Sequence, residues 1–124
     1  MTTRGLGLVV LSALLTVASN LMLRGGVTRA GGLALSLNTL AGDLLKLAAQ
    51  PLFMTGLTLY GTAALVWFSV LSTENLNTSY PLLVSLTFIL VTLGATMFYR
   101  EPISWQKVLG IGVILTGIIL IARA

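Results

Sequence analysis

The polar side chains that could do chemistry in this chain lie mostly inside apolar segments. Ser12, Thr16 and Asn20 recur every four residues, with Ser19 beside them, so they share one face of a helix. An amide is costly to bury in apolar surroundings without a partner. The stripe is therefore a candidate wall of a hydrated cavity. The alternative is that the hydroxyls bond to their own helix backbone or to a neighbouring helix.

Similar hydroxyl stripes recur further along the chain, in its second and third apolar segments: Thr55, Thr58 and Thr62, then Ser85, Thr92 and Thr96. None of these groups ionises near neutral pH, so none offers a site for proton exchange. The chain also contains no His and no Cys, which excludes a Ser-His-Asp triad, a histidine proton shuttle and thiolate or histidine zinc sites. We therefore expect no cofactor, no metal and no covalent enzymatic step.

Two arginines follow the first apolar segment, in the glycine-rich stretch RGGVTRAGG at 24–32. A guanidinium group presents a planar fork of donors that suits phosphate, and glycines let a loop approach an anion closely. We expect this stretch to be a flexible loop in which Arg24 and Arg29 bind a phosphate headgroup. The alternative is that both arginines are topology signals that touch ordinary lipid phosphates.

The amino-acid composition indicates whether the surface of this chain faces water or lipid. The 124 residues are 56% hydrophobic and only 8% charged, whereas a soluble domain carries roughly 25% charged residues. The length allows one domain, 1–124, with lipid as its main solvent. The net charge of +4 comes from scattered cations rather than from one basic face, which argues against a nucleic-acid partner.

Four apolar runs have the length of membrane-spanning helices, at about 6–23, 52–72, 80–99 and 105–121. A backbone exposed to lipid must satisfy its own hydrogen bonds, so each run should be helical. The predicted fold class is an all-α membrane protein with four transmembrane helices. The first run is too long for a secretory signal and no small-residue cleavage site follows it, so we expect it to be retained.

Between the first two spans, four leucines recur at spacings of three and four: Leu37, Leu40, Leu44 and Leu47. Asp43 and Lys46 lie off this stripe. The pattern predicts a short amphipathic helix over about 36–49 that lies in the membrane interface. An ordinary leucine-rich loop is the alternative.

The cations divide unequally between the two sides of this arrangement. Arg4 and Arg123 fall on one side, and the other side carries five: Arg24, Arg29, Lys46, Arg100 and Lys107. The positive-inside rule makes the five-cation side cytoplasmic and places both termini outside. Glu101, between the last two spans, is expected to cap the following turn or to pair with Arg100 or Lys107.

The last span carries small residues, Gly112, Thr116 and Gly117, of the kind that let helices approach closely. We therefore expect this span to contact another helix or a second subunit.

Residues 79–121, SYPLLVSLTFILVTLGATMFYREPISWQKVLGIGVILTGIILI, resemble the last two helices of the drug/metabolite transporter superfamily. The distinctive parts are Tyr80-Pro81, the Arg100-Glu101-Pro102 turn and the glycine-spaced closing helix. VASNLMLRGG at 17–26 resembles the end of the first helix in the four-helix branch, so the resemblance covers nearly the whole chain.

Two branches of that superfamily have this size. Small multidrug resistance proteins are proton-coupled dimers, but Thr16 stands where they carry a glutamate and Leu83 where they carry a tryptophan. The chain is more similar to the small subunits proposed to flip undecaprenyl-phosphate-aminoarabinose across the bacterial inner membrane. The similarity lies in Tyr80-Pro81, in the Glu101-Pro102 turn and in the basic segment after the first helix.

The resemblance implies a multi-pass protein of the bacterial inner membrane that translocates a polyprenyl-phosphate-linked sugar or a similar phospholipid. It would act as a dimer, either with itself or with a paralogue. Arg24 and Arg29 would engage the phosphate, and four residues would line the headgroup path: Ser12, Thr16, Asn20 and Tyr80. Two alternatives stay open. One is a small multidrug-type exporter that uses an inward-folded carboxylate from Asp43, Glu74 or Glu101, and the other is a membrane scaffold subunit that transports nothing.

Overall fold

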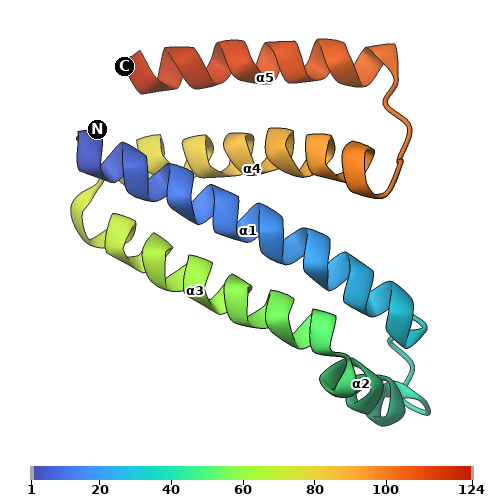
Figure 1. The fold of residues 1–124 in the computed structure, drawn as a ribbon. Coiled ribbons are helices and arrows are strands. Elements are labelled where there is room, and N and C mark those ends of the chain that lie inside the picture. Colours follow the sequence, from blue (N-terminus) through green and yellow to red (C-terminus); the bar gives the residue numbers. More distant parts are fainter. Residues whose placement is uncertain (1, 124) are drawn as a thin grey trace.

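The computed structural model describes residues 2–123, which form five helices and no strand (Figure 1). The helices are α1 (Thr3–Ala30), α2 (Leu40–Ala49), α3 (Pro51–Thr73), α4 (Leu76–Phe98) and α5 (Trp105–Arg123). All except α2 are long and apolar enough to cross a membrane. The predicted all-α fold class is confirmed, with four helices of spanning length and one short helix between the first two.

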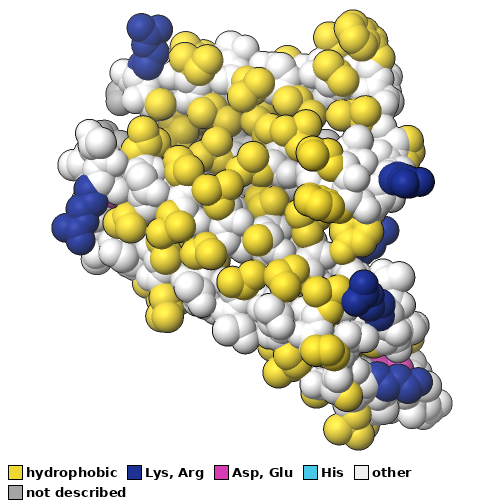
Figure 2. All heavy atoms as spheres, in the orientation of Figure 1, with side chains coloured by type: hydrophobic (Ala, Val, Ile, Leu, Met, Phe, Trp, Pro, Cys, Tyr) yellow, Lys and Arg dark blue, Asp and Glu magenta, His cyan; other side chains and the backbone are white. Residues whose placement is uncertain are grey.

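The four long helices lie side by side in the order α5, α4, α1, α3 (Figure 1). The ends of α1 and α5 that carry Arg4 and Arg123 lie at one end of the molecule, whereas α2 and the α4–α5 connection lie at the other. Figure 2 shows the result on one face: apolar side chains fill the middle, and Lys and Arg side chains gather at the two ends. This division matches the two groups of cations expected from the sequence.

The first helix is longer than predicted, because RGGVTRA continues α1 to Ala30 instead of forming a flexible loop. The prediction of a loop at this point is wrong. Gly25 and Gly26 are buried inside the helix. A Cβ atom added at Gly26 would lie 2.6 Å from the Cα of Phe53 in α3. These two glycines therefore allow α1 and α3 to pack closely, as small residues do between membrane helices.

A second glycine pair ends α1. Gly31 and Gly32 have φ values of 94° and 90°, a left-handed conformation that favours glycine. Their N–H groups bond to the carbonyls of Thr28 and Val27, which satisfies acceptors in the last turn.

Two other helices begin at residues that differ from the predicted ones. Residues 37–39 form a turn, so α2 begins at Leu40, and the side chain of Leu37 is 96% exposed. In contrast, α4 begins before Tyr80, because the polar residues that resembled a loop form its first turn. The Oγ of Ser79 donates to the carbonyl of Asn75 at 2.8 Å within that turn.

The best-buried apolar cluster joins three helices: Val9 of α1, Val70 of α3 and Leu82 of α4. Ile118 and Ile121 of α5 pack against its edge. No described residue of α5 is itself buried. The first, third and fourth helices thus form the packed unit, and most of α5 faces outward.

Candidate functional site

A cavity of about 240 Å³ lies where α1, α3 and α4 meet, lined by Ser12, Thr16, Tyr60, Ala63, Ala64, Trp67, Tyr80 and Leu83. We call it the Tyr80 pocket. The rings of Trp67 and Tyr80 meet at a tilt of 52°, with 6.0 Å between their centroids. The pocket therefore brings together three of the predicted substrate-binding residues, Ser12, Thr16 and Tyr80, with aromatic walls beside them.

The hydroxyl protons of Ser12 and Thr16 are committed to backbone carbonyls. Ser12 is 1% exposed, and its hydroxyl donates across to the carbonyl of Ala63 in α3 at 3.2 Å. Thr16 donates to the carbonyl of Ser12 at 2.8 Å. What these groups present to the cavity is therefore mainly oxygen lone pairs, which accept hydrogen bonds. Such a wall suits a guest that carries hydroxyl or amino donors.

Most of the other hydroxyls bond to the backbone of their own helix, which was the alternative to lining a cavity. Five threonine hydroxyls donate to the carbonyl four residues earlier in their own helix: Thr55, Thr58, Thr62, Thr92 and Thr96. The threonines of α3 are exposed and do not line the Tyr80 pocket. The three stripes thus do not meet in one polar cavity.

Removing the Ser12 hydroxyl should weaken the α1–α3 contact. We expect Ser12→Ala to lower the free energy of unfolding in detergent by about 1 kcal/mol, because the Ala63 carbonyl loses an interhelical donor. Ser72→Ala is the matched control, since Ser72 of α3 bonds only within its own helix, at 2.7 Å to Ser69. Equal unfolding midpoints for the two variants would contradict the prediction.

The Tyr80 pocket continues along α4. An adjoining cavity of about 480 Å³ shares Thr16, Tyr80 and Leu83 with it. A third cavity, of about 370 Å³ between α4 and α5, shares Phe88, Val91 and Thr92 with the second. We call the three together the α4 groove. From Tyr80 to Thr96 it follows α4 for roughly 24 Å, most of the thickness of a bilayer's hydrocarbon core.

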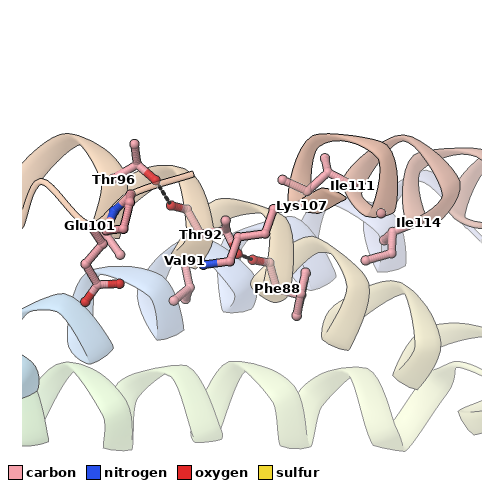
Figure 3. Close-up of a pocket in the computed structure, with 11 residues that line it drawn as sticks. Phe88, Val91, Thr92, Thr96, Glu101, Lys107, Ile111 and Ile114 are labelled. Carbon is pink, nitrogen blue, oxygen red and sulfur yellow. Dashed lines mark hydrogen bonds between the residues drawn. The ribbon is translucent and has the colours of Figure 1, made fainter. Parts of the chain in front are cut away.

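The third cavity, shown in Figure 3, ends at charged residues of the α4–α5 connection. Glu101 and Lys107 line it together with the apolar side chains of Val91, Ile111 and Ile114. The α4 groove is therefore apolar for most of its length and charged at the end of the molecule that carries five cations.

Arg24 lies at this same end, where it joins α1 to the α4–α5 connection. Its Nη1 lies 2.8 Å from Oε1 of Glu101, and its guanidinium carbon lies 5.6 Å from the ring centroid of Tyr99. The Tyr99 hydroxyl in turn donates to the carbonyl of Leu21 in α1. We call Arg24, Tyr99 and Glu101 the Arg24 cluster.

The prediction that Glu101 caps the next turn or pairs with Arg100 or Lys107 is wrong. Its carboxylate turns toward α1 to meet Arg24, and the cap of α5 is Ser104, whose Oγ accepts from the Lys107 N–H at 3.2 Å. Arg24 and Glu101 keep side-chain exposures of 60% and 39%. An ion pair this exposed contributes about 0–1 kcal/mol, so an anionic ligand could replace the carboxylate at little cost.

Two predicted site residues lie apart from these clusters. Asn20 is half-buried in α1 but does not line the Tyr80 pocket. Arg29 is exposed in the last turn of α1. It lies five residues beyond Arg24, so the two side chains leave the helix about 140° apart. The structure does not bring the two arginines to one point.

Among the residues of the groove walls that sequence reasoning did not predict as site residues are Tyr60 and Lys107. Tyr60 precedes Trp67 by two helical turns, with Ala63 and Ala64 between them, which is the spacing of a single helix face. That spacing was the available signal. Lys107 had none, because its approach to α4 depends on the path of the α4–α5 connection.

The chain's three carboxylates all lie near helix ends or in connections. Glu74 accepts a hydrogen bond from the Thr2 hydroxyl at 2.6 Å, Asp43 from the Ala34 N–H at 3.4 Å, and Glu101 pairs with Arg24. None of them lines the Tyr80 pocket. Within residues 2–123, the geometry thus offers no carboxylate beside Thr16 for proton exchange, which an exporter of cationic drugs would require.

A relative from Erwinia tasmaniensis is 35% identical to this chain over 111 residues, which cover 90% of each protein. It is named as a probable 4-amino-4-deoxy-L-arabinose-phosphoundecaprenol flippase subunit, ArnE. The chain belongs to the ArnE family. An ArnE relative from an Enterobacter species is 43% identical over 68 residues, covering 55% of this chain and 63% of that protein. No family model matches the chain, and no solved structure matches it either.

Membership of the ArnE family agrees with the four helices of spanning length. The chain is a multi-pass protein of the bacterial inner membrane, and its ArnE relatives are named as probable flippase subunits, which are transporters rather than enzymes. The resemblance to these small flippase subunits noted from Tyr80-Pro81 and the Glu101-Pro102 turn is confirmed.

Proposed function

We propose that this chain is a subunit of a flippase that moves a polyprenyl-phosphate-linked sugar between the two leaflets of the inner membrane. The likeness to the ArnE protein of Erwinia tasmaniensis, over 90% of both chains, carries this proposal. The α4 groove supports it, because a lipid-linked substrate needs an apolar track for its tail beside a polar path for its headgroup.

The sugar would pass through the Tyr80 pocket while the prenyl tail stays in the two other cavities of the α4 groove and in the surrounding lipid. Oxygen atoms of Ser12 and Thr16 and the Tyr80 hydroxyl would accept hydrogen bonds from the sugar. Arg24 would bind the phosphate at the cytoplasmic end, where the phosphate would replace Glu101 as its partner. In this scheme Asn20 and Arg29 contact the substrate at other points along α1, or they only set the orientation of the protein in the membrane.

A partner subunit would complete the path, since a pocket of about 240 Å³ is small for a sugar phosphate and is bounded by only three helices. The outward face of α5 supports such a contact. A Cβ atom added at Gly112 or Gly117 would meet no described atom within 4 Å, so this face of α5 is open. The Thr116 hydroxyl donates to the Gly112 carbonyl within α5. We propose that this face meets a second copy or a paralogue.

Transport can be measured with the substrate named for the ArnE relatives, whose sugar carries an amino group. Liposomes containing that lipid and this chain, alone or together with a candidate partner subunit, would be exposed to an amine reagent that cannot cross membranes. We expect the labelled fraction to rise above that of empty liposomes as inner-leaflet lipid reaches the surface. Thr16→Leu should slow this rise at least about tenfold, because an isobutyl group blocks the pocket and removes an acceptor.

The control is Ser72→Ala, which changes an exposed hydroxyl outside the groove and should flip the lipid at the unaltered rate. If the protein is correctly assembled and labelling still never exceeds that of protein-free liposomes, the result would favour the alternative of a scaffold subunit that transports nothing. Unaltered rates in Thr16→Leu would move the headgroup path away from the Tyr80 pocket.

A further inference from the structure

Lys107 is a cation of the α4 groove that the proposed function leaves unused. It lies in the first turn of α5, and Figure 3 shows its side chain crossing the third cavity toward α4. The carboxylate of Glu101 turns the other way, to Arg24. Within residues 2–123 the only ion pair is that between Arg24 and Glu101, so Lys107 has no acidic partner there.

Lys107 is an exposed residue whose side chain lies beside a cavity with mostly apolar walls. The cavity walls that face it are apolar, from Phe88, Val91, Ile111 and Ile114. Apart from Glu101, the polar side chains of this cavity are those of Thr92 and Thr96, and both hydroxyls already donate to backbone carbonyls in α4. The exposed Lys107 side chain extends over this cavity of about 370 Å³ toward α4, so its ammonium is accessible both to lipid headgroups and to a ligand in the cavity.

We infer that Lys107 binds the phosphate of the polyprenyl lipid at the mouth of the α4 groove, with the first isoprenyl units lying against α4. This inference rests on the proposed function and adds the position at which the carrier first docks. An ammonium group supplies three donors and a full charge to a phosphate, while the apolar walls exclude water from the tail.

The occupant is a phospholipid rather than a free phosphate, because the charged end of the groove leads directly into apolar walls. The third cavity shares Phe88 and Val91 with the next one along α4, so a tail held there continues toward the Tyr80 pocket. Arg24 pairs with Glu101 from α1, and Lys107 lines the same cavity as Glu101 from α5. The phosphate would dock on Lys107 and then compete with Glu101 for Arg24.

The test is native mass spectrometry of the full chain in mild detergent with undecaprenyl phosphate or undecaprenol as the probe. We expect Lys107→Gln to weaken retention of undecaprenyl phosphate about tenfold, the effect of losing one charged hydrogen bond. Retention of undecaprenol, which has no phosphate, should not change. Lys107→Arg should restore binding, since it keeps the charge.

Lys46→Gln is the matched control, because Lys46 is an exposed lysine at the same end of the molecule, in α2 and outside the groove. Equal losses in Lys46→Gln and Lys107→Gln would mean that general surface charge holds the lipid, and would overturn the inference. Full binding by Lys107→Gln, with wild-type protein still preferring undecaprenyl phosphate to undecaprenol, would overturn it while leaving the proposed function intact. A wild-type protein without that preference would overturn both.

Discussion

Gly26→Ala is expected to push α1 away from α3 and to lower the free energy of unfolding by about 3 kcal/mol, the upper range for an overpacked site. The new Cβ would lie 2.6 Å from the Cα, N and Cβ atoms of Phe53, and two of these atoms belong to the α3 backbone. A backbone cannot rotate aside as a side chain does, so the two helices must separate. Thermal or denaturant unfolding in detergent, followed by helical circular dichroism, would measure the loss.

Gly7→Ala provides the control within the same helix. A Cβ at Gly7 meets no atom within 4 Å, so alanine should leave stability unchanged or raise it slightly. Should Gly26→Ala unfold at the same midpoint as Gly7→Ala, the close α1–α3 contact described above would be incorrect. Insertion into the membrane should be normal in both variants, because neither changes the apolar length of α1.

The second large effect is expected at the Arg24 cluster, where two substitutions should act in opposite directions. Arg24→Ala removes the proposed phosphate ligand and should weaken retention of undecaprenyl phosphate by roughly 10- to 100-fold, the range for a charged hydrogen bond. Glu101→Gln removes the competing carboxylate while keeping the size of the side chain. It should therefore strengthen retention, since Arg24 becomes free to meet the phosphate. Native mass spectrometry of both variants would give the two values.

The opposite signs separate binding from a purely structural role. If Arg24 served only to hold α1 against the α4–α5 connection, either substitution would break the same ion pair, and the two variants would behave alike. The double variant Arg24→Ala/Glu101→Gln should bind as weakly as Arg24→Ala alone, because no carboxylate remains to be displaced and no guanidinium remains to bind. Equal losses in the two single variants would return Arg24 to a structural or topological role.

The fold could be predicted from the sequence where an apolar run alone decides the outcome. The long helices follow from runs that only a helix can carry through lipid, and the short helix follows from Leu40, Leu44 and Leu47. The end of α1 could not be predicted in this way. A glycine pair looks the same in sequence whether it ends a helix, as Gly31 and Gly32 do, or lets another helix approach, as Gly25 and Gly26 do. The distinction depends on Phe53, which is known to lie there only from the folded chain.

The same limit applies to the candidate site. Ser12 and Thr16 could be assigned to one wall because helical spacing fixes their relative positions. The partner of Glu101 could not be assigned, because the nearest cations along the chain are Arg100 and Lys107, and the true partner is 77 residues away. Local reasoning ranks partners by sequence separation, whereas an ion pair depends on where helix ends meet in space.

The length of α1 makes the position of this helix sensitive to the thickness of the bilayer. Arg4 and Arg24 lie about 20 residues apart on this one helix, a rise of roughly 30 Å that equals the hydrocarbon thickness of a typical membrane. A thinner bilayer must tilt the helix or draw one arginine away from its headgroup layer, at a fraction of a kcal/mol for each ångström. Since both the Arg24–Glu101 pair and the hydrogen bond from the Tyr99 hydroxyl to the Leu21 carbonyl join α1 to the α4–α5 connection, such a tilt also moves that connection. The acyl-chain length of the host membrane thereby acts on the charged mouth of the groove, and the lipid around the protein becomes one of the variables that set its working rate.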